Sequence, residues 1–293
     1  MLLTPDCIPC ILRMAVSSIR KLTDDENVTR ELITRALRLP ALRGEDWNLT
    51  SPQAIEPVMN MIMETFKSDD PFRDLKEEEN AKALELYPTF KQSVRESEDP
   101  LFAAVNLAIM GNGVDLMVSD RSIDVKEVLA KGLRNQITAK PYEIFREKLA
   151  KSRRLLYLCD NSGEIVFDKV LIETINDLYD PEITFVVRNL PALNDATLYE
   201  ARRVGMDSVA RVMSNGIDGS VPGTVLSRCS QELRDLFENC DLVIAKGGGN
   251  FDSLEGEKDK CRNITFMFLA KCVPYAMYFK TRMFQPILGN FFK

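Results

Sequence analysis

Residues 154–164 read RLLYLCDNSGE, an apolar run that passes directly into polar and acidic residues. The run Arg154–Cys159 is short and continuous, as in a strand buried on both faces of a sheet, and Val166–Leu178 then has helical periodicity. Three more such strands are expected downstream, at Ile183–Val187, Val209–Met213 and Leu242–Ala245, with helices at Ala196–Val204 and Gly223–Phe237. Strands that alternate with helices across short links predict an α/β fold, with a mainly parallel sheet covered by helices on both faces.

The first half of the chain has a different pattern, because no strand-like alternation of useful length precedes residue 150. The stretch Asp69–Asn80 carries many charges and is interpreted as a solvated helix or loop. Helices are predicted from apolar spacing or start signals at Ile11–Leu22, Val28–Leu37, Ser51–Phe66, Pro100–Met110 and Asp124–Leu133. We therefore predict a helical N-terminal subdomain, residues 1–145, followed by an α/β core, residues 146–293.

Composition narrows the class of protein. The 293 residues carry a net charge of −6, and no run of Lys and Arg suits a nucleic-acid backbone. No stretch is apolar for long enough to span a bilayer, and no targeting segment is recognised at the start. We expect a cytoplasmic protein that binds neither nucleic acid nor membrane, and the sequence leaves the oligomeric state open.

The chain contains no histidine and seven cysteines. Any metal site must therefore use carboxylate, amide, carbonyl or thiolate ligands. Cys7 and Cys10 form a C-x-x-C pair, but a four-ligand zinc site needs a second pair or added histidines. A structural or incidental role is favoured for this pair, and a redox pair or a metal clip shared with another cysteine are the alternatives.

Polar side chains follow each of the four predicted strands. Ligands of open parallel sheets bind at the carboxyl ends of the strands, so these groups are expected to converge. In chain order they include Asp160, Asn161 and Glu164, then Arg188, Asn194 and Asp195, then Asn215, and finally Lys246, Gly247, Gly249 and Asn250. Each group alone also fits an ordinary turn or helix cap. Their joint placement at one edge favours a functional site.

The chemistry of this set is that of phosphoryl transfer. Two carboxylates, Asp160 and Asp195, with the amide oxygen of Asn161 make a hard-oxygen site suited to Mg²⁺ or Mn²⁺. Lys246 is expected to neutralise phosphate charge, and the glycines after it allow backbone N–H groups to approach the phosphate closely. Such a site depends on metal, lysine and backbone donors more than on a covalent nucleophile.

The motif Asp160-Asn161-Ser162-Gly163-Glu164 resembles the Asp-Asn-x-Gly-Glu signature of the damage-control phosphatases, formerly domain of unknown function eighty-nine. Further blocks resemble this family at residues 194–197, 200–205, 214–216, 222–224 and 246–254. The start, Asp6-Cys7-x-x-Cys10, and the segment 268–272 are similar to its prokaryotic branch. The insertion Gly219-Ser220-Val221 and the tail 280–293 depart from the family pattern.

The resemblance implies a three-layer α/β/α core after a helical N-terminal part. It implies metal ligands at Asp160, Asn161 and Asp195, binding Mn, Co, Ni or Mg. By the same resemblance Lys246 contacts the substrate phosphate and Asn215 lies at the edge of the site. Catalytic roles are predicted for Asp160, Lys246 and Asn215. Substrate binding is predicted for Lys246, Asn215, Glu164, Gly247, Gly249 and Asn250.

The implied activity is hydrolysis of small phosphate monoesters, such as sugar phosphates or phosphopantetheine-type metabolites, in metabolite damage control. The partner is therefore a small phosphorylated metabolite. Attack by water activated at the metal is preferred to an aspartyl-phosphate on Asp160, because that carboxylate is also a predicted ligand. Two other functions stay open: an S-adenosylmethionine-dependent carboxyl methyltransferase, and a non-catalytic module that binds phosphometabolites.

Overall fold

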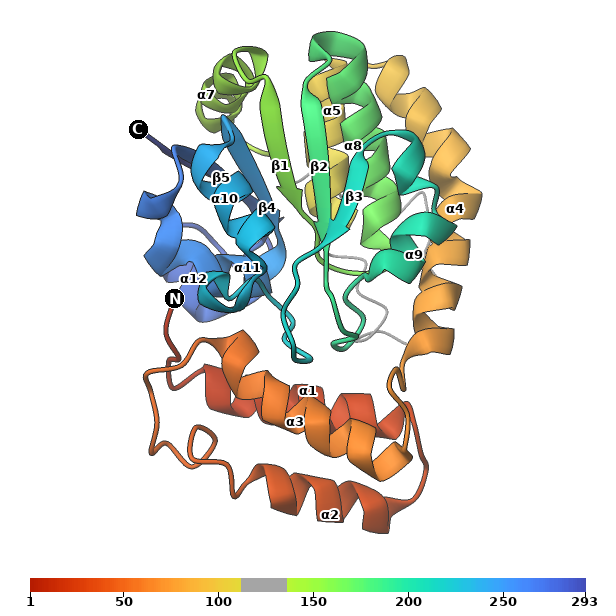
Figure 1. Ribbon diagram of the computed structural model, residues 1–293, viewed down its shortest axis with the longest axis vertical. Coiled ribbons are helices and arrows are strands. Elements are labelled where there is room, and N and C mark those ends of the chain that lie inside the picture. Colours follow the sequence, from red (N-terminus) through yellow and green to blue (C-terminus); the bar gives the residue numbers. More distant parts are fainter. Residues whose placement is uncertain (112–135) are drawn as a thin grey trace.

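The computed structural model describes residues 1–111 and 136–293 (Figure 1). Its centre is a six-stranded sheet in the order β3-β2-β1-β4-β5-β6. Neighbouring strands from β3 to β5 are parallel, and β6 is antiparallel to β5. The strands are β1 (Arg154–Leu158), β2 (Glu182–Val187), β3 (Arg211–Ser214), β4 (Leu242–Lys246), β5 (Asn263–Leu269) and β6 (Pro286–Phe292). The predicted α/β fold with a mainly parallel sheet is confirmed.

Helices cover both faces of the sheet, and alternate residues of each strand point to opposite faces. Leu155 and Tyr157 pack in one hydrophobic cluster with residues of α4, α5, α7 and α8. Leu156 and Leu158 pack in another cluster with residues of α10 and α11. These helices are α4 (Arg73–Arg95), α5 (Pro100–Gly111), α7 (Ala139–Ala150), α8 (Glu164–Tyr179), α10 (Gln231–Asn239) and α11 (Gly247–Leu254).

Three N-terminal helices, α1 (Cys7–Arg20), α2 (Glu26–Ala36) and α3 (Ser51–Phe66), lie together below the sheet (Figure 1). They bury Ile11, Leu32 and Val58 in a third hydrophobic cluster of their own. Residues 83–110, by contrast, share the cluster of β1 and α8. The helices of the first half therefore lie in two places. Helices α1, α2 and α3 lie beneath the carboxyl ends of the strands, and α4 and α5 pack on one face of the sheet. The division into domains at residue 145 stays a prediction.

The four predicted strands are present, whereas β5 and β6 were not predicted. Strand β5 is buried along its whole length. Its apolar run continues after Lys271 into the short helix α12 (Val273–Tyr278), so the local sequence carries no clear signal of where a strand ends. Because β5 was not predicted, Lys271, the charged residue that follows this strand, was not expected at the edge of the sheet.

One helix prediction differs from the structure, and one has no counterpart among the described residues. The helix expected at Gly223–Phe237 is a loop and a short 3-10 turn, η2 (Leu226–Arg228), followed by α10. Helix α10 begins later because the Ser230 side chain accepts a hydrogen bond from the backbone N–H of Leu233 and so caps it. The expected helix Asp124–Leu133 lies outside the described residues.

The charged stretch Asp69–Asn80 is largely the first turns of α4, and part of it is buried rather than solvated. The Lys76 ammonium is inaccessible and forms ion pairs with Asp70 at 2.7 Å and Glu200 at 3.0 Å. Glu200 lies in α9 (Leu198–Arg203), whose cap Thr197 donates to the Glu200 carboxylate. The charges therefore connect α4 to the segment that follows β2. Within the described part of the chain, no helix is long and apolar enough to cross a membrane.

Candidate active site

A pocket of about 190 Å³ lies at the carboxyl ends of the parallel strands. Asp160 and Asn161 line it after β1, and Asn194 and Asp195 line it after β2. The first turns of α3 and the segment after β5 also line the pocket, through Ser51, Pro52, Ile55, Lys271 and Tyr275. The predicted convergence of Asp160, Asn161 and Asp195 is therefore present as geometry. The pocket is also lined by side chains of α3, which the prediction did not include.

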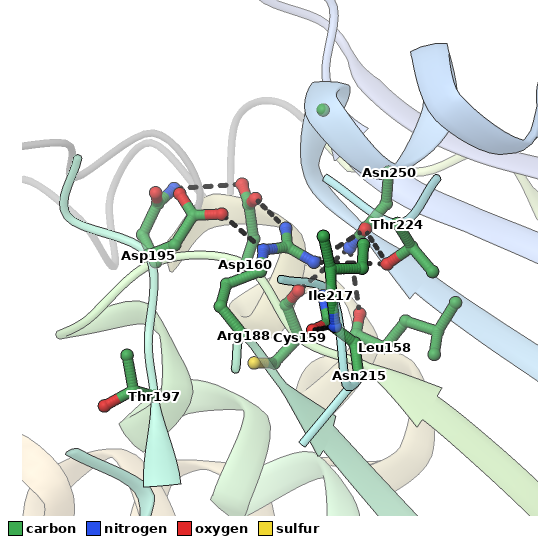
Figure 2. Close-up of polar contacts among 12 residues, drawn as sticks. Leu158, Cys159, Asp160, Arg188, Asp195, Thr197, Asn215, Ile217, Thr224 and Asn250 are labelled. Carbon is green, nitrogen blue, oxygen red and sulfur yellow. Dashed lines mark hydrogen bonds and ion pairs between the residues drawn. The ribbon is translucent and has the colours of Figure 1, made fainter. Parts of the chain in front are cut away.

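Arg188 holds the two predicted metal-binding carboxylates together (Figure 2). Its Nε donates to Asp195 Oδ2 at 2.5 Å, and its NH2 group lies 3.4 Å from Asp160 Oδ1. The remaining nitrogen, NH1, donates to Thr224 Oγ1 at 3.2 Å and to Asn250 Oδ1 at 3.0 Å. Because Arg188 is only 2% exposed, this fork of hydrogen bonds fixes the guanidinium, and the guanidinium in turn fixes the carboxylates.

Burial dominates the electrostatics of the two carboxylates. It raises the pKa of Asp160 well above its usual value, and the neighbouring Asp195 and Glu164 raise that pKa further. Burial also raises the pKa of Asp195, although Arg188 opposes the change. One buried arginine thus does not fully compensate the clustered acidic groups. An added positive charge beside Asp160 and Asp195 would favour their ionised forms.

The Asn161 amide is oriented by two acidic neighbours. Its Nδ2 group donates to Asp160 Oδ2 at 3.0 Å and to Glu164 Oε2 at 3.2 Å. The backbone of Asn161 also forms an isolated antiparallel bridge with Asp195, which brings the segments after β1 and β2 together. With both N–H groups of the amide donated to carboxylates, Oδ1 is the atom left to accept or to coordinate.

The glycines after β4 have protein atoms packed closely against them. Gly247 has a φ of +79°, and a Cβ atom there would lie 1.9 Å from Asp160 Oδ2. Gly249 lines the pocket, and its Cβ would lie 2.1 Å from the carbonyl oxygen of Pro222. The glycines therefore accommodate the Asp160 carboxylate and the loop after β3. Their predicted contact with substrate stays a prediction.

Lys246 lies in the interior rather than on the pocket wall. It is the last residue of β4, and its position in the strand places it on the same face as Leu242 and Ile244, toward α5 and α8. Its Nζ donates to Glu164 Oε1 and Asp168 Oδ1, both at 2.6 Å, and to the backbone oxygen of Ala108 at 2.9 Å. All three ammonium protons are therefore used within the protein, and the predicted contact of Lys246 with a substrate phosphate stays a prediction.

Glu164 is buried beside Lys246 with a side chain 1% exposed, so its predicted direct contact with substrate has no open path here. Asn215 is also buried, and its Oδ1 accepts from the backbone N–H groups of Asn189 at 3.0 Å and Ile217 at 3.1 Å. These bonds shape the turn after β3. Asn250 Nδ2 donates to the backbone oxygen of Cys159 at 2.8 Å and so supports the end of β1. The structure gives these three residues supporting contacts, and their predicted substrate roles stay untested.

Sequence reasoning did not assign functions to Arg188 or Lys271. Arg188 directly follows β2, so its position was a usable signal. Lys271 follows β5 and lines the pocket, where its charge favours the ionised form of Asp160. Without β5 in the predicted sheet, this lysine was not recognised as a residue at a strand end.

The C-x-x-C pair lies at the start of α1, with Cys7 half-buried and Cys10 exposed. All seven cysteines are free thiols. Across residues 1–111 and 136–293, no three His, Cys, Asp or Glu side chains gather in an arrangement that could hold a metal. A metal at the pocket would therefore rely on two carboxylates together with an amide. The role of Cys7 and Cys10 stays a prediction.

Comparison with known proteins places the chain in a family. Residues 3–285 match the damage-control phosphatase ARMT1-like domain. An uncharacterized protein of Methanocaldococcus jannaschii is 33% identical over 93% of this chain and 90% of its own length. A damage-control phosphatase of Pyrococcus horikoshii is 28% identical over 94% and 93%, and one of Archaeoglobus fulgidus is 29% identical over 94% of each chain.

The fold agrees with these matches. The crystal structure of a DUF89 family protein from Pyrococcus horikoshii superposes with a TM-score of 0.85, at 28% identity, and the match covers 98% of both chains. Fold and site together define a three-layer α/β protein with a carboxylate-rich pocket at its strand ends. The chain belongs to the damage-control phosphatase ARMT1-like domain family.

Proposed function

We propose that this protein hydrolyses small phosphate monoesters with the help of a divalent metal held by Asp160, Asn161 and Asp195. The observation that carries the proposal is the meeting of two buried carboxylates and one oriented amide at a pocket that also contains Lys271. Relatives named damage-control phosphatases support the reaction class. The donor set suits Mg²⁺ or Mn²⁺, and the resemblance to the damage-control phosphatases implies Co²⁺ and Ni²⁺ as further possibilities.

The residues present fit such an ion. Carboxylate and amide oxygens are hard donors, and the raised pKa values of Asp160 and Asp195 indicate negative charge that an added cation would relieve. Gly247 leaves the space in which the Asp160 carboxylate lies. When bound, the metal supplies a Lewis acid for a phosphoryl oxygen and makes hydroxide available near neutral pH.

The chain's own groups position the substrate. Lys271, on the pocket wall, is placed to balance charge on the phosphoryl oxygens, the role first expected of Lys246. Asp160 is held by hydrogen bonds from Asn161 and Arg188, which favours a ligand over a covalent nucleophile. We therefore prefer direct attack by water, and a phospho-enzyme trapped in a quenched reaction would overturn this preference.

The pocket favours a compact substrate. Its volume is about 190 Å³, and Pro52 and Ile55 of α3 together with Leu193 give it an apolar wall. Ser51 and Asn194 add polar groups within reach of hydroxyls on a leaving group. Small phosphorylated metabolites such as sugar phosphates fit this combination, and a phosphopantetheine-type substrate would have to extend outside the pocket.

The test is phosphate release from a panel of phosphate esters, after metal has been stripped and Mg²⁺, Mn²⁺, Co²⁺ or Ni²⁺ has been added back. Turnover should require metal and should be lost in Asp160→Ala and Asp195→Ala. Absence of turnover from folded protein with every ester and metal would refute the proposal. Tight binding of an ester would then indicate a binding module, and stabilisation by S-adenosylmethionine but not Mn²⁺ would indicate a methyltransferase.

A further inference from the structure

We propose that Lys246 and Glu164 are positioning residues, which fix the Asn161 amide so that its oxygen faces the metal. The proposal rests on the metal site of the proposed function and adds a role for the buried ion pair of Lys246 and Glu164 next to that site. It explains why a lysine at the end of a strand is directed into the interior. It also explains why an acidic residue so close to the site is closed off from the pocket.

Three side chains form one continuous series of contacts. Lys246 Nζ donates to Glu164 Oε1 at 2.6 Å, and the other oxygen of the same carboxylate, Oε2, accepts from Asn161 Nδ2 at 3.2 Å. The side chains of Lys246 and Glu164 are 0% and 1% exposed, whereas Asn161 reaches the pocket. The series therefore leads from the interior to the predicted metal ligand.

The acidic groups determine which way the amide faces. An asparagine amide can rotate by half a turn, which exchanges its donor and its acceptor with little change in shape. Here the rotated form would direct Oδ1 at the carboxylates of Asp160 and Glu164, with repulsion in place of two hydrogen bonds. The observed form leaves Oδ1 for a cation, and NH2 groups do not coordinate cations.

Lys246 keeps the Glu164 carboxylate in place. A buried carboxylate without a partner is costly, and it would move or recruit another donor. Lys246 donates to Glu164, to Asp168 and to a backbone oxygen, so its position is fixed from three sides. Residues that orient metal ligands typically change metal affinity by 10- to 100-fold when they are replaced.

Asp168 offers a matched control within the same cluster. It accepts from Lys246 at the same 2.6 Å and is equally buried, but it also accepts from the Tyr157 hydroxyl, at 2.7 Å, where Glu164 accepts from Asn161. A purely structural role predicts similar effects of Glu164→Gln and Asp168→Asn. A positioning role predicts that only the change at Glu164 affects the metal site.

The experiment measures Mn²⁺ affinity by calorimetry, without substrate, in wild type, Glu164→Gln, Lys246→Met and Asp168→Asn, and the unfolding temperature of each metal-free protein. Glu164→Gln and Lys246→Met should raise the Mn²⁺ dissociation constant roughly tenfold or more, and Asp168→Asn less than threefold. If Glu164→Gln fails to fold, Glu164→Asp retains the charge for Lys246 but withdraws the carboxylate from Asn161, and should weaken binding in the same way.

Unchanged Mn²⁺ affinity in the Glu164 variant that folds, or equal weakening in Asp168→Asn, would overturn the positioning role. Wild-type protein that binds no divalent metal would overturn it as well, and would at the same time contradict the metal dependence of the proposed function. Metal binding by wild type with no effect at Glu164 would contradict the inference alone.

Discussion

The backbone of Gly247 lies against the carboxylate of Asp160, and a Cβ atom at Gly247 would come within 1.9 Å of Oδ2. A side chain at the first residue of α11 would therefore occupy the space of Asp160, a predicted metal ligand that follows β1. A φ of +79° at Gly247 adds a second reason for glycine, because side chains disfavour this conformation.

Gly247→Ala should displace the Asp160 carboxylate and reduce phosphate release by at least tenfold, since small shifts of catalytic groups are costly. The matched control is Gly256→Ala, because a Cβ atom at Gly256 would meet no atom within 4 Å. Steady-state assays of both variants with added Mn²⁺ measure the difference. Equal activity in the two variants would show that the Asp160 position is not required.

Replacement of Asp160 by Asn should separate stability from metal binding. The variant loses one buried acidic group whose pKa is raised by burial and by Asp195, so the metal-free protein should gain about 1 kcal/mol in free energy of unfolding. Mn²⁺ should then no longer raise its unfolding temperature. Thermal unfolding with and without metal tests both statements, and retained stabilisation by Mn²⁺ would contradict the assignment of Asp160 as a ligand.

Lys271→Met should lower kcat/KM for phosphate esters roughly 100-fold, as expected when one charged donor to a phosphoryl group is lost. Lys271 lines the pocket, whereas Lys140 is exposed at the start of α7. Lys140→Met is therefore the control, and its kinetics should equal those of wild type. Wild-type kinetics in Lys271→Met would show that this lysine does not contribute to binding or transfer of the phosphoryl group.

A bidentate ion pair connects the N-terminal helices to the loop after β3. Arg228 donates to the two carboxylate oxygens of Glu56, in α3, at 2.7 and 2.9 Å. The pair is partly buried, so a double-mutant cycle with Arg228→Met and Glu56→Gln should give a coupling of about 1 kcal/mol. The exposed pair Arg211–Glu232 should give less than about 0.5 kcal/mol in the same urea titrations. Equal couplings would contradict the importance of burial here.

Asp252 should make stability depend on pH. Burial raises its pKa to about 6, although hydrogen bonds from Ser51 and Tyr275 oppose the change. Because the folded protein binds this proton more tightly than the unfolded chain, the proton stabilises the folded state. This stabilisation is fully present below the unfolded pKa of about 3.8 and is lost as the pH rises through the folded pKa of about 6. Relative to Asp252→Asn, wild type should therefore lose up to about 3 kcal/mol of unfolding free energy between pH 4 and 7. Parallel pH profiles of the two proteins would refute this.

Local sequence was sufficient for the central strands and for the meeting of three polar residues at the ends of the strands. Strands β1, β2 and β4 are continuous apolar runs because helices cover both faces of the sheet, and such runs are visible without any tertiary information. The ends of parallel strands share one edge, so Asp160, Asn161 and Asp195 could be expected to meet there. These three line the pocket.

Tertiary structure alone decided which charged groups face the pocket and which support it. Lys246 and Lys271 both follow apolar strand residues, yet one is buried against α8 and the other lines the pocket. Whether each lysine faces the interior or the pocket depends on the strand register and on the helix that packs on that face of the sheet. For Lys271 it also depends on where β5 ends, which the sequence does not show because the apolar run of β5 merges with that of α12. The pairing of Arg188 with two carboxylates, and the placement of α3 over the strand ends, likewise join segments far apart in sequence, and short-range patterns carry no information about such contacts.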